Sequence, residues 1–80
     1  MVWKEEDMLL VKEFKFKDFL GAIEFVNKVA KLAERINHHP NILIHSYNLV
    51  RITLTTHSEN KITKKDYEMA KEIDKLLSSF

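Results

Sequence analysis

The chain has 80 residues, and this length predicts one domain, residues 1–80, with a small core that favours association with copies of itself. Its 13 Lys and Arg balance 12 Asp and Glu, without a block of like charges, which argues against nucleic-acid or membrane partners. The absence of cysteine excludes disulfides and cysteine-based zinc sites, and no apolar run reaches the ~18 residues of a membrane span.

Two short strands and a helix are predicted for the first 36 residues. Strand-forming residues occupy Val2–Lys4 and Leu9–Phe16, with the acidic Glu5–Asp7 as the turn between them. Asp18 is suited to cap a helix that runs to about Ile36. The helix has two apolar rows, which are Phe19, Ile23, Val26, Ala30 and Ala33, and then Ala22, Phe25, Val29, Leu32 and Ile36.

The second apolar row of this helix makes its apolar face wider than contact with one sheet requires. We therefore expect Phe25, Val29 and Leu32 to form a contact between subunits. Because a domain of this length has a small core, a homodimer or homotetramer is expected.

Two strands follow the helix, which must end before Pro40 because the residue preceding a proline is driven out of α geometry. The strands are predicted over Ile42–Tyr47 and Val50–Thr56, joined at Asn48–Leu49. Leu49 is poorly suited to positive φ, which favours a loop longer than two residues. Alternation along the last strand places His57 away from its apolar face.

A second helix is predicted for the end of the chain. Thr63 and Asp66 have the spacing of a capping box. They precede an apolar stripe of Met69, Ala70, Ile73, Leu76, Leu77 and Phe80. The order β-β-α-β-β-α suits an α+β fold, in which both helices cover one face of an antiparallel sheet.

Three histidines, His38, His39 and His57, indicate proton transfer, because imidazole titrates near neutral pH. They belong to a set at fixed spacing, namely Glu34, His38, His39, Pro40, Tyr47, His57, Thr63 and Asp66. This set resembles the signature of the pterin-4a-carbinolamine dehydratases. The resemblance extends from Trp3 to about Leu77 and includes Phe14-x-Phe16-x-x-Phe19 and Ile62-Thr63-x-x-Asp66.

The resemblance implies a four-stranded antiparallel sheet with two helices packed on one face, in dimers or tetramers. The implied activity is dehydration of the small-molecule substrate 4a-hydroxytetrahydropterin to quinonoid dihydropterin in pterin recycling, without a cofactor or metal. Such a reaction needs an acid and a base that face one ring.

The resemblance also implies roles for single residues. His38 and His57 would perform acid–base catalysis, and His39 would chiefly hold the pterin. The substrate-binding residues would be Glu34, Pro40, Thr56, Ser58, Glu59 and Asp66. Among these, Pro40 and the backbone of residues 56–59 would line the ring site, and the two carboxylates would orient histidines or bind ring nitrogens.

The sequence departs from the family in three places. It shows no counterpart of the further N-terminal helix that most members have. The segment from Pro40 to Tyr47 is one residue longer, with Ile42 or Leu43 where an aromatic residue is common. Residues 58–61 replace a loop that often contains glycines, so the backbone there has less freedom to approach a ligand.

Simpler interpretations of these residues remain open. The histidine pair could only terminate a helix, Asp66 could only cap one, and Glu34 could be an exposed helix residue. Tyr47 is interpreted as a core or wall residue, since aromatic residues in strands usually pack. A metal site at the three motif histidines is disfavoured, because no carboxylate-rich or cysteine ligand set accompanies them.

The alternative function is a non-enzymatic protein-interaction module, because animal members of the family also serve as dimerisation cofactors of a transcription factor. A cytoplasmic location is expected, since Met1 precedes a charged segment, Lys4–Asp7, that is unlike a secretory signal.

Overall fold

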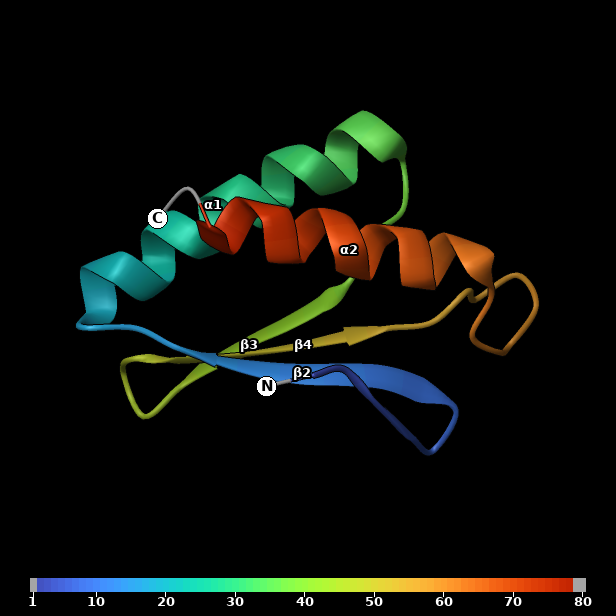
Figure 1. The fold of residues 1–80 in the computed structure, drawn as a ribbon, viewed down its shortest axis with the longest axis horizontal. Helices are drawn as coiled ribbons and strands as arrows, with labels where there is room; N and C mark the ends of the chain where they lie inside the picture. Colours follow the sequence, from blue (N-terminus) through green and yellow to red (C-terminus); the bar gives the residue numbers. More distant parts are fainter. Residues whose placement is uncertain (1, 79–80) are drawn as a thin grey trace.

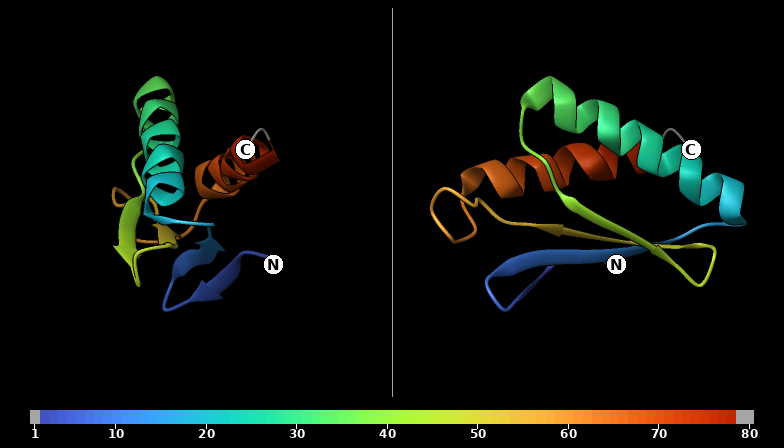
Figure 2. Two further views of the ribbon diagram at one scale, coloured as in Figure 1. Left: turned by 90° about the vertical axis from the view of Figure 1, so that its left-hand side faces the viewer. Right: turned by 180° about the vertical axis from the view of Figure 1, so that it is seen from behind.

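A computed structural model of the chain describes residues 2–78. The elements are β1 (Lys4–Glu6), β2 (Leu9–Lys15), α1 (Phe19–Ile36), β3 (Asn41–His45), β4 (Leu49–Leu54) and α2 (Lys64–Ser78). The strands form one antiparallel sheet in the order β1-β2-β4-β3. Both helices lie on the same face of this sheet (Figures 1 and 2). The predicted fold class and element order are therefore confirmed.

The core lies between the sheet and the helices, because alternate residues of the central strands face the same side. Leu10 is paired with Leu54, and Phe14 with Val50, and all four are buried. The ring of Phe25 from α1 packs 4.9 Å from the ring of Phe14, measured between centroids. The sheet and α1 thus share one aromatic cluster.

The prediction that Phe25, Val29 and Leu32 form a subunit contact is wrong. Their exposed fractions are 0%, 0% and 1% in the single chain, because α1 packs against both the sheet and α2 and needs a wide apolar face for these two contacts. In the other predicted row, Phe19 is 51% exposed. The sequence predicted the width of the apolar face of α1 correctly. It did not show that the row with Phe25, Val29 and Leu32 packs in the core.

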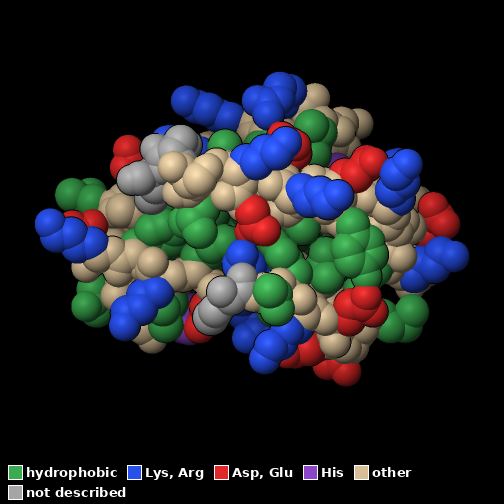
Figure 3. All heavy atoms as spheres, in the orientation of Figure 1, with side chains coloured by type: hydrophobic (Ala, Val, Ile, Leu, Met, Phe, Trp, Pro, Cys, Tyr) green, Lys and Arg blue, Asp and Glu red, His purple; other side chains and the backbone are tan. Residues whose placement is uncertain are grey.

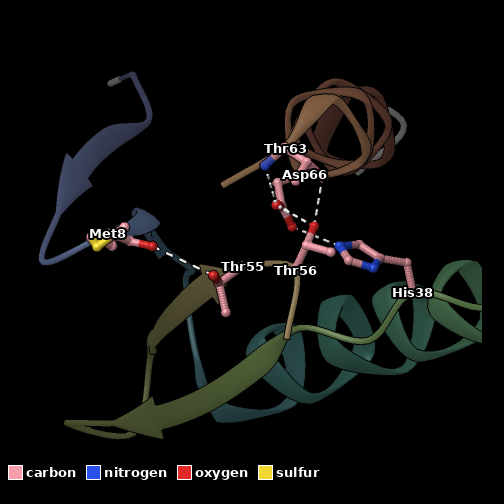
Figure 4. Close-up of polar contacts among 6 residues, drawn as sticks. All are labelled: Met8, His38, Thr55, Thr56, Thr63 and Asp66. Carbon is pink, nitrogen blue, oxygen red and sulfur yellow. Dashed lines mark hydrogen bonds and ion pairs between the residues drawn. The ribbon is translucent and has the colours of Figure 1, made fainter. Parts of the chain in front are cut away.

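Both hairpin turns differ from their predicted positions. Glu5 and Glu6 belong to β1, and the first turn consists of Asp7 and Met8, with φ of 50° and 64°. The backbone carbonyl of Met8 accepts a hydrogen bond of 3.5 Å from the hydroxyl of Thr55 (Figure 4). Non-glycine residues at positive φ are uncommon, so turn chemistry alone did not place this turn.

The second hairpin loop comprises residues 46–48, and Leu49 begins β4. It is longer than two residues, as expected, but lies earlier than the predicted Asn48–Leu49 junction. Tyr47 is in this loop with φ of 56° and is 64% exposed, so its interpretation as a core residue of a strand is wrong. The buried side chain of Asn48 instead donates 3.0 Å to the carbonyl of Phe16.

The predicted helix caps are confirmed. The carboxylate of Asp18 accepts a 2.8 Å hydrogen bond from the backbone N–H of Gly21. In α2, Met69, Ala70 and Ile73 are buried as the apolar stripe predicts, whereas Phe80 lies outside the described residues. Neither helix has the length and apolar content that crossing a membrane would need.

Apolar side chains are visible between α2 and the sheet, while charged side chains of both signs are spread around them (Figure 3). At this seam the carboxylate of Asp74 accepts hydrogen bonds from the indole of Trp3 at 3.2 Å and the ammonium of Lys12 at 2.8 Å. These contacts attach α2 to β2 and to the start of the chain. None of these three residues belongs to the set of motif residues that contains the histidines.

Candidate functional site

His38 leaves the end of α1 in a fixed direction. The helix stops at Asn37, which has the left-handed φ of 54° that asparagine tolerates better than most residues. The backbone N–H of His38 then donates 3.2 Å to the carbonyl of Ala33. Helix termination and presentation of a histidine are therefore accomplished by the same turn.

The imidazole of His38 contacts the carboxylate of Asp66, which comes from the first turn of α2. The distance from Nε2 of His38 to Oδ1 of Asp66 is 2.6 Å (Figure 4). The side chain of Asp66 is 0% exposed and that of His38 is 15% exposed. A histidine held by a buried carboxylate is the arrangement used to fix an acid–base imidazole.

The second oxygen of the Asp66 carboxylate accepts two further hydrogen bonds. The backbone N–H of Thr63 and the hydroxyl of Thr56 each lie 2.9 Å from Oδ2. The bond from Thr63 completes the predicted capping box. Asp66 therefore caps α2 and holds His38 at the same time, so the two interpretations left open by the sequence apply together.

Burial raises the pKa of Asp66, but the hydrogen bonds from His38, the Thr63 backbone and the Thr56 hydroxyl outweigh it, so the pKa lies below its ordinary value of 3.8. The carboxylate is thus ionised at neutral pH. It can accept hydrogen bonds but cannot donate one.

This lowered pKa predicts a pH-dependent stability. Because the folded chain holds Asp66 ionised more strongly than the unfolded chain, its contribution is complete above the unfolded value of 3.8 and is lost as the pH falls through the lower folded pKa. We expect the melting temperature to fall between about pH 5 and pH 2, and to fall less in Asp66→Asn. Thermal unfolding followed by circular dichroism measures this. Equal acid sensitivity of the two proteins would contradict it.

An open groove of about 500 Å³ lies between the end of α1 and the outer side of α2, and His38 is part of its lining. Ile36 and Met69 are the apolar residues of its lining, and of these Ile36 is exposed whereas Met69 is buried. The charged residues that line the groove are Lys65, Glu68, Lys71, Glu72 and Lys75. Its volume is in the range of small-molecule sites.

His39 forms a separate pair with the carboxylate of Glu34 one turn earlier in α1. Its Nε2 lies 2.5 Å from Oε2 of Glu34, and both side chains are more than half exposed. Glu34 is therefore a partner of His39 and not of His38. Pro40, which is half-buried, follows and leads directly into β3.

His57 lies in the loop that connects β4 to α2. Its side chain is exposed, whereas the preceding Thr56 is buried, as alternation along the strand predicts. Ser58 and Glu59 are also exposed in this loop. Within residues 2–78 the His57 side chain makes no hydrogen bond or ion pair. The structure thus brings His38 and Asp66 together, but it does not bring the three histidines into one contact.

The hydroxyls of Thr56 and Thr63 are site groups that the sequence analysis missed. It assigned Thr56 through its backbone, but the N–H and carbonyl of that residue bond Lys61 and Glu59 within the loop. The alternation that placed His57 outside implies that Thr56 points inside, where a hydroxyl needs a polar partner. That signal could have identified it.

A further histidine pair lies on the uncovered face of the sheet, where Nε2 of His45 is 2.7 Å from Oε2 of Glu13. His45 is outside the motif. It pairs with Leu49 at the start of β4, whereas Thr56, which contacts Asp66, follows the end of that strand. No group of three or more His, Cys, Asp or Glu residues able to hold a metal ion occurs within residues 2–78.

The fold and the site together define a small α+β domain in which a histidine at the end of one helix pairs with a buried aspartate at the start of the other. Comparison with known proteins identifies the family to which this domain belongs. The model of the pterin 4 alpha carbinolamine dehydratase family matches residues 1–76. The chain belongs to this family.

Relatives and solved structures agree with this assignment. A protein of Sulfolobus acidocaldarius, whose name assigns it provisionally as a pterin-4-alpha-carbinolamine dehydratase, is 45% identical to this chain. The match covers 92% of this chain and 80% of that protein. A crystal structure from Brucella melitensis, described as a transcriptional coactivator/pterin dehydratase, has a TM-score of 0.85 and 39% identity, covering 92% of this chain and 80% of that one.

A third similar protein has a different described role. It is a pterin dehydratase-like protein identified as a RuBisCO assembly factor in the alpha-carboxysome, with a TM-score of 0.81 and 26% identity. The likeness covers 95% of this chain and 89% of that one. The same fold is therefore found in a protein described as an assembly factor and in one described as a transcriptional coactivator/pterin dehydratase.

Proposed function

We propose that the chain dehydrates a 4a-hydroxytetrahydropterin to the quinonoid dihydropterin by histidine acid–base catalysis. The observation that carries the proposal is the contact of 2.6 Å between His38 and the fully buried, ionised Asp66 beside a groove of small-molecule size. Family membership supplies the substrate class. The reaction needs no group beyond positioned proton carriers.

The chemistry follows from the substrate. A ring nitrogen supplies the electron pair that breaks the bond between carbon and hydroxyl, the hydroxyl leaves as water after it gains a proton, and the nitrogen loses its own proton to a base. In this proposal His38 and His57 carry these protons, and His39, held by Glu34, binds the ring. Pro40 and the exposed loop with Ser58 and Glu59 would form the rest of the pocket wall.

The proposal predicts the effects of three substitutions. His38→Ala and His57→Ala should each lower the dehydration rate by at least ~10-fold, because each removes one positioned proton carrier. His45→Ala should have little effect, because its pair with Glu13 lies on the uncovered face of the sheet. The measurement is the decay of chemically generated 4a-hydroxytetrahydropterin, between pH 6 and 8, with and without a chelator.

Two outcomes would contradict the dehydratase proposal. The first is a folded wild-type chain that does not accelerate this decay over the buffer rate at any pH in the range. The second is a larger loss from His45→Ala than from His57→Ala, which would mean that the site is assigned to the wrong residues. Loss of activity with the chelator would instead indicate a metal-dependent site.

The second candidate is a protein-interaction module without catalysis. It is favoured by the 26% identical assembly factor, which has the same fold. A chain that folds normally but shows no dehydration would support this candidate. Self-association as a homodimer or homotetramer in the cytoplasm belongs to either proposal, but Phe25, Val29 and Leu32 are not available for the contact because they are buried in the core.

A further inference from the structure

Two threonine hydroxyls, one buried and one half-buried, lie next to the Asp66 carboxylate. The Oγ1 atom of Thr56 lies 2.9 Å from Oδ2 of Asp66 and 2.6 Å from Oγ1 of Thr63 (Figure 4). A hydroxyl has one hydrogen to donate, and an ionised carboxylate can only accept. Thr56 therefore donates to Asp66, and Thr63 must donate to Thr56.

This order of donors determines which ring nitrogen of His38 carries the hydrogen. Oδ2 of Asp66 already accepts from the Thr63 backbone and the Thr56 hydroxyl, and Oδ1 faces Nε2 of His38. Nε2 must then donate its hydrogen. A neutral imidazole has one N–H, so Nδ1 of His38 holds the free electron pair, and within residues 2–78 it has no hydrogen-bond partner.

We infer that Thr56 and Thr63 are positioning residues for His38, and that their hydroxyls form a one-way donor chain through Asp66 that makes Nδ1 the atom exchanging protons with a ligand. The chain runs from Thr63 to Thr56, then to the carboxylate, and ends at the imidazole. The role of Nδ1 in catalysis rests on the proposed function, whereas the control of the imidazole by the two threonines does not.

The inference predicts the direction of a measurable change. The hydroxyl of Thr56 stabilises the Asp66 carboxylate most when the neighbouring imidazole is neutral, because a protonated imidazole already balances part of the charge. Removing the hydroxyl should therefore favour the protonated imidazole. The titration curve of His38 should move to higher pH.

Other charged groups near His38 do not change in this experiment. Its pairing carboxylate comes from α2, and Lys65, Glu68, Lys71, Glu72 and Lys75 line the same groove. All of these are on α2, whereas Thr56 is buried behind it at 4% exposure. A shift in the titration of His38 after substitution of Thr56 would thus act through Asp66.

The test compares Thr56→Val, which keeps the branched shape but loses the hydroxyl, with Thr56→Ser, which keeps the hydroxyl. The imidazole signals of His38 are followed by NMR from pH 4 to 9. We expect Thr56→Val to shift the curve upward by ~0.5 pH unit or more and Thr56→Ser to match the wild type. Thr63→Val should shift it in the same direction by less, and it serves if Thr56→Val does not fold.

A double-mutant cycle tests the route of the effect. In an Asp66→Asn background, Thr56→Val should leave the His38 curve unchanged, because the carboxylate through which it acts is gone. Equal curves for Thr56→Val, Thr56→Ser and wild type, or a shift that persists without Asp66, would overturn the inference. A lower melting temperature without any shift would leave the threonines a structural role alone, and would also overturn it.

The same variants separate this inference from the proposed function. The pH profile of dehydration should move together with the NMR curve if His38 is the proton carrier. If the NMR curve moves and the pH profile does not, the catalytic role of His38 fails while the donor chain stands. If the wild type has no activity, the NMR comparison still decides the inference.

Discussion

Replacing Asp66 with asparagine is expected to lower the dehydration rate by about 10²-fold or more without unfolding the chain. The orientation of the new side chain is determined by its surroundings. The position of Oδ2 faces two donors, the Thr63 backbone and the Thr56 hydroxyl, so the amide oxygen must occupy it. The amide nitrogen then faces His38 and donates to Nε2, which forces the proton of the neutral ring onto Nδ1.

Kinetics and spectroscopy measure the two parts of this expectation. Nitrogen chemical shifts of His38 above its titration should change from protonated Nε2 to protonated Nδ1, and the rate should fall with it. Asp18→Asn is the matched control, because asparagine caps a helix as well as aspartate does and Asp18 is exposed. A folded Asp66→Asn variant that keeps more than half of the wild-type rate would show that Asp66 does not orient a catalytic imidazole.

The largest effect on stability is expected for Phe25. Its side chain is 0% exposed and its ring lies 4.9 Å from the rings of both Phe14 and Phe16. Phe25→Ala should lower the free energy of unfolding by about 3–5 kcal/mol, because it removes a large buried side chain and leaves a cavity. In a small domain this is a large share of the total stability.

Urea unfolding measures this loss, and Leu20→Ala on the same helix is the control. Leu20 is 76% exposed, and its truncation should change stability by no more than about 0.5 kcal/mol. The sequence alone placed Phe25 in a contact between subunits, where a buried unpaired charge would be expected to dissociate them. The buried position predicts instead that Phe25→Glu unfolds the chain, and a folded, monomeric Phe25→Glu variant would contradict this.

The sequence predicted the elements that strong local signals specify. Asp18 and the Thr63–Asp66 pair marked the helix starts correctly, and Pro40 marked where α1 must end. The hairpin turns were misplaced because Met8 and Tyr47 adopt positive φ without the glycine or asparagine that usually indicates it. Local patterns could not reveal a conformation that the neighbouring strands impose.

The candidate site was predictable as a set of residues but not as a set of contacts. The motif named His38 and Asp66, yet it did not tell that Glu34 pairs with His39 instead of His38. Nor could spacing show that Phe25, Val29 and Leu32 of α1 are buried in the core. Which residues touch depends on how two helices pack on one sheet, and that information is absent from the period of either helix.

The contact between His38 and Asp66 joins segments that are 28 residues apart, at the end of one helix and the beginning of the other. A molecule that prefers the paired imidazole must therefore also prefer the packed arrangement of α1 and α2. By thermodynamic linkage the effect is reciprocal: tighter packing of α1 against α2, which stabilises the contact between His38 and Asp66, also raises the affinity for that ligand. Ligand affinity and resistance to local opening are in this way two measures of one equilibrium.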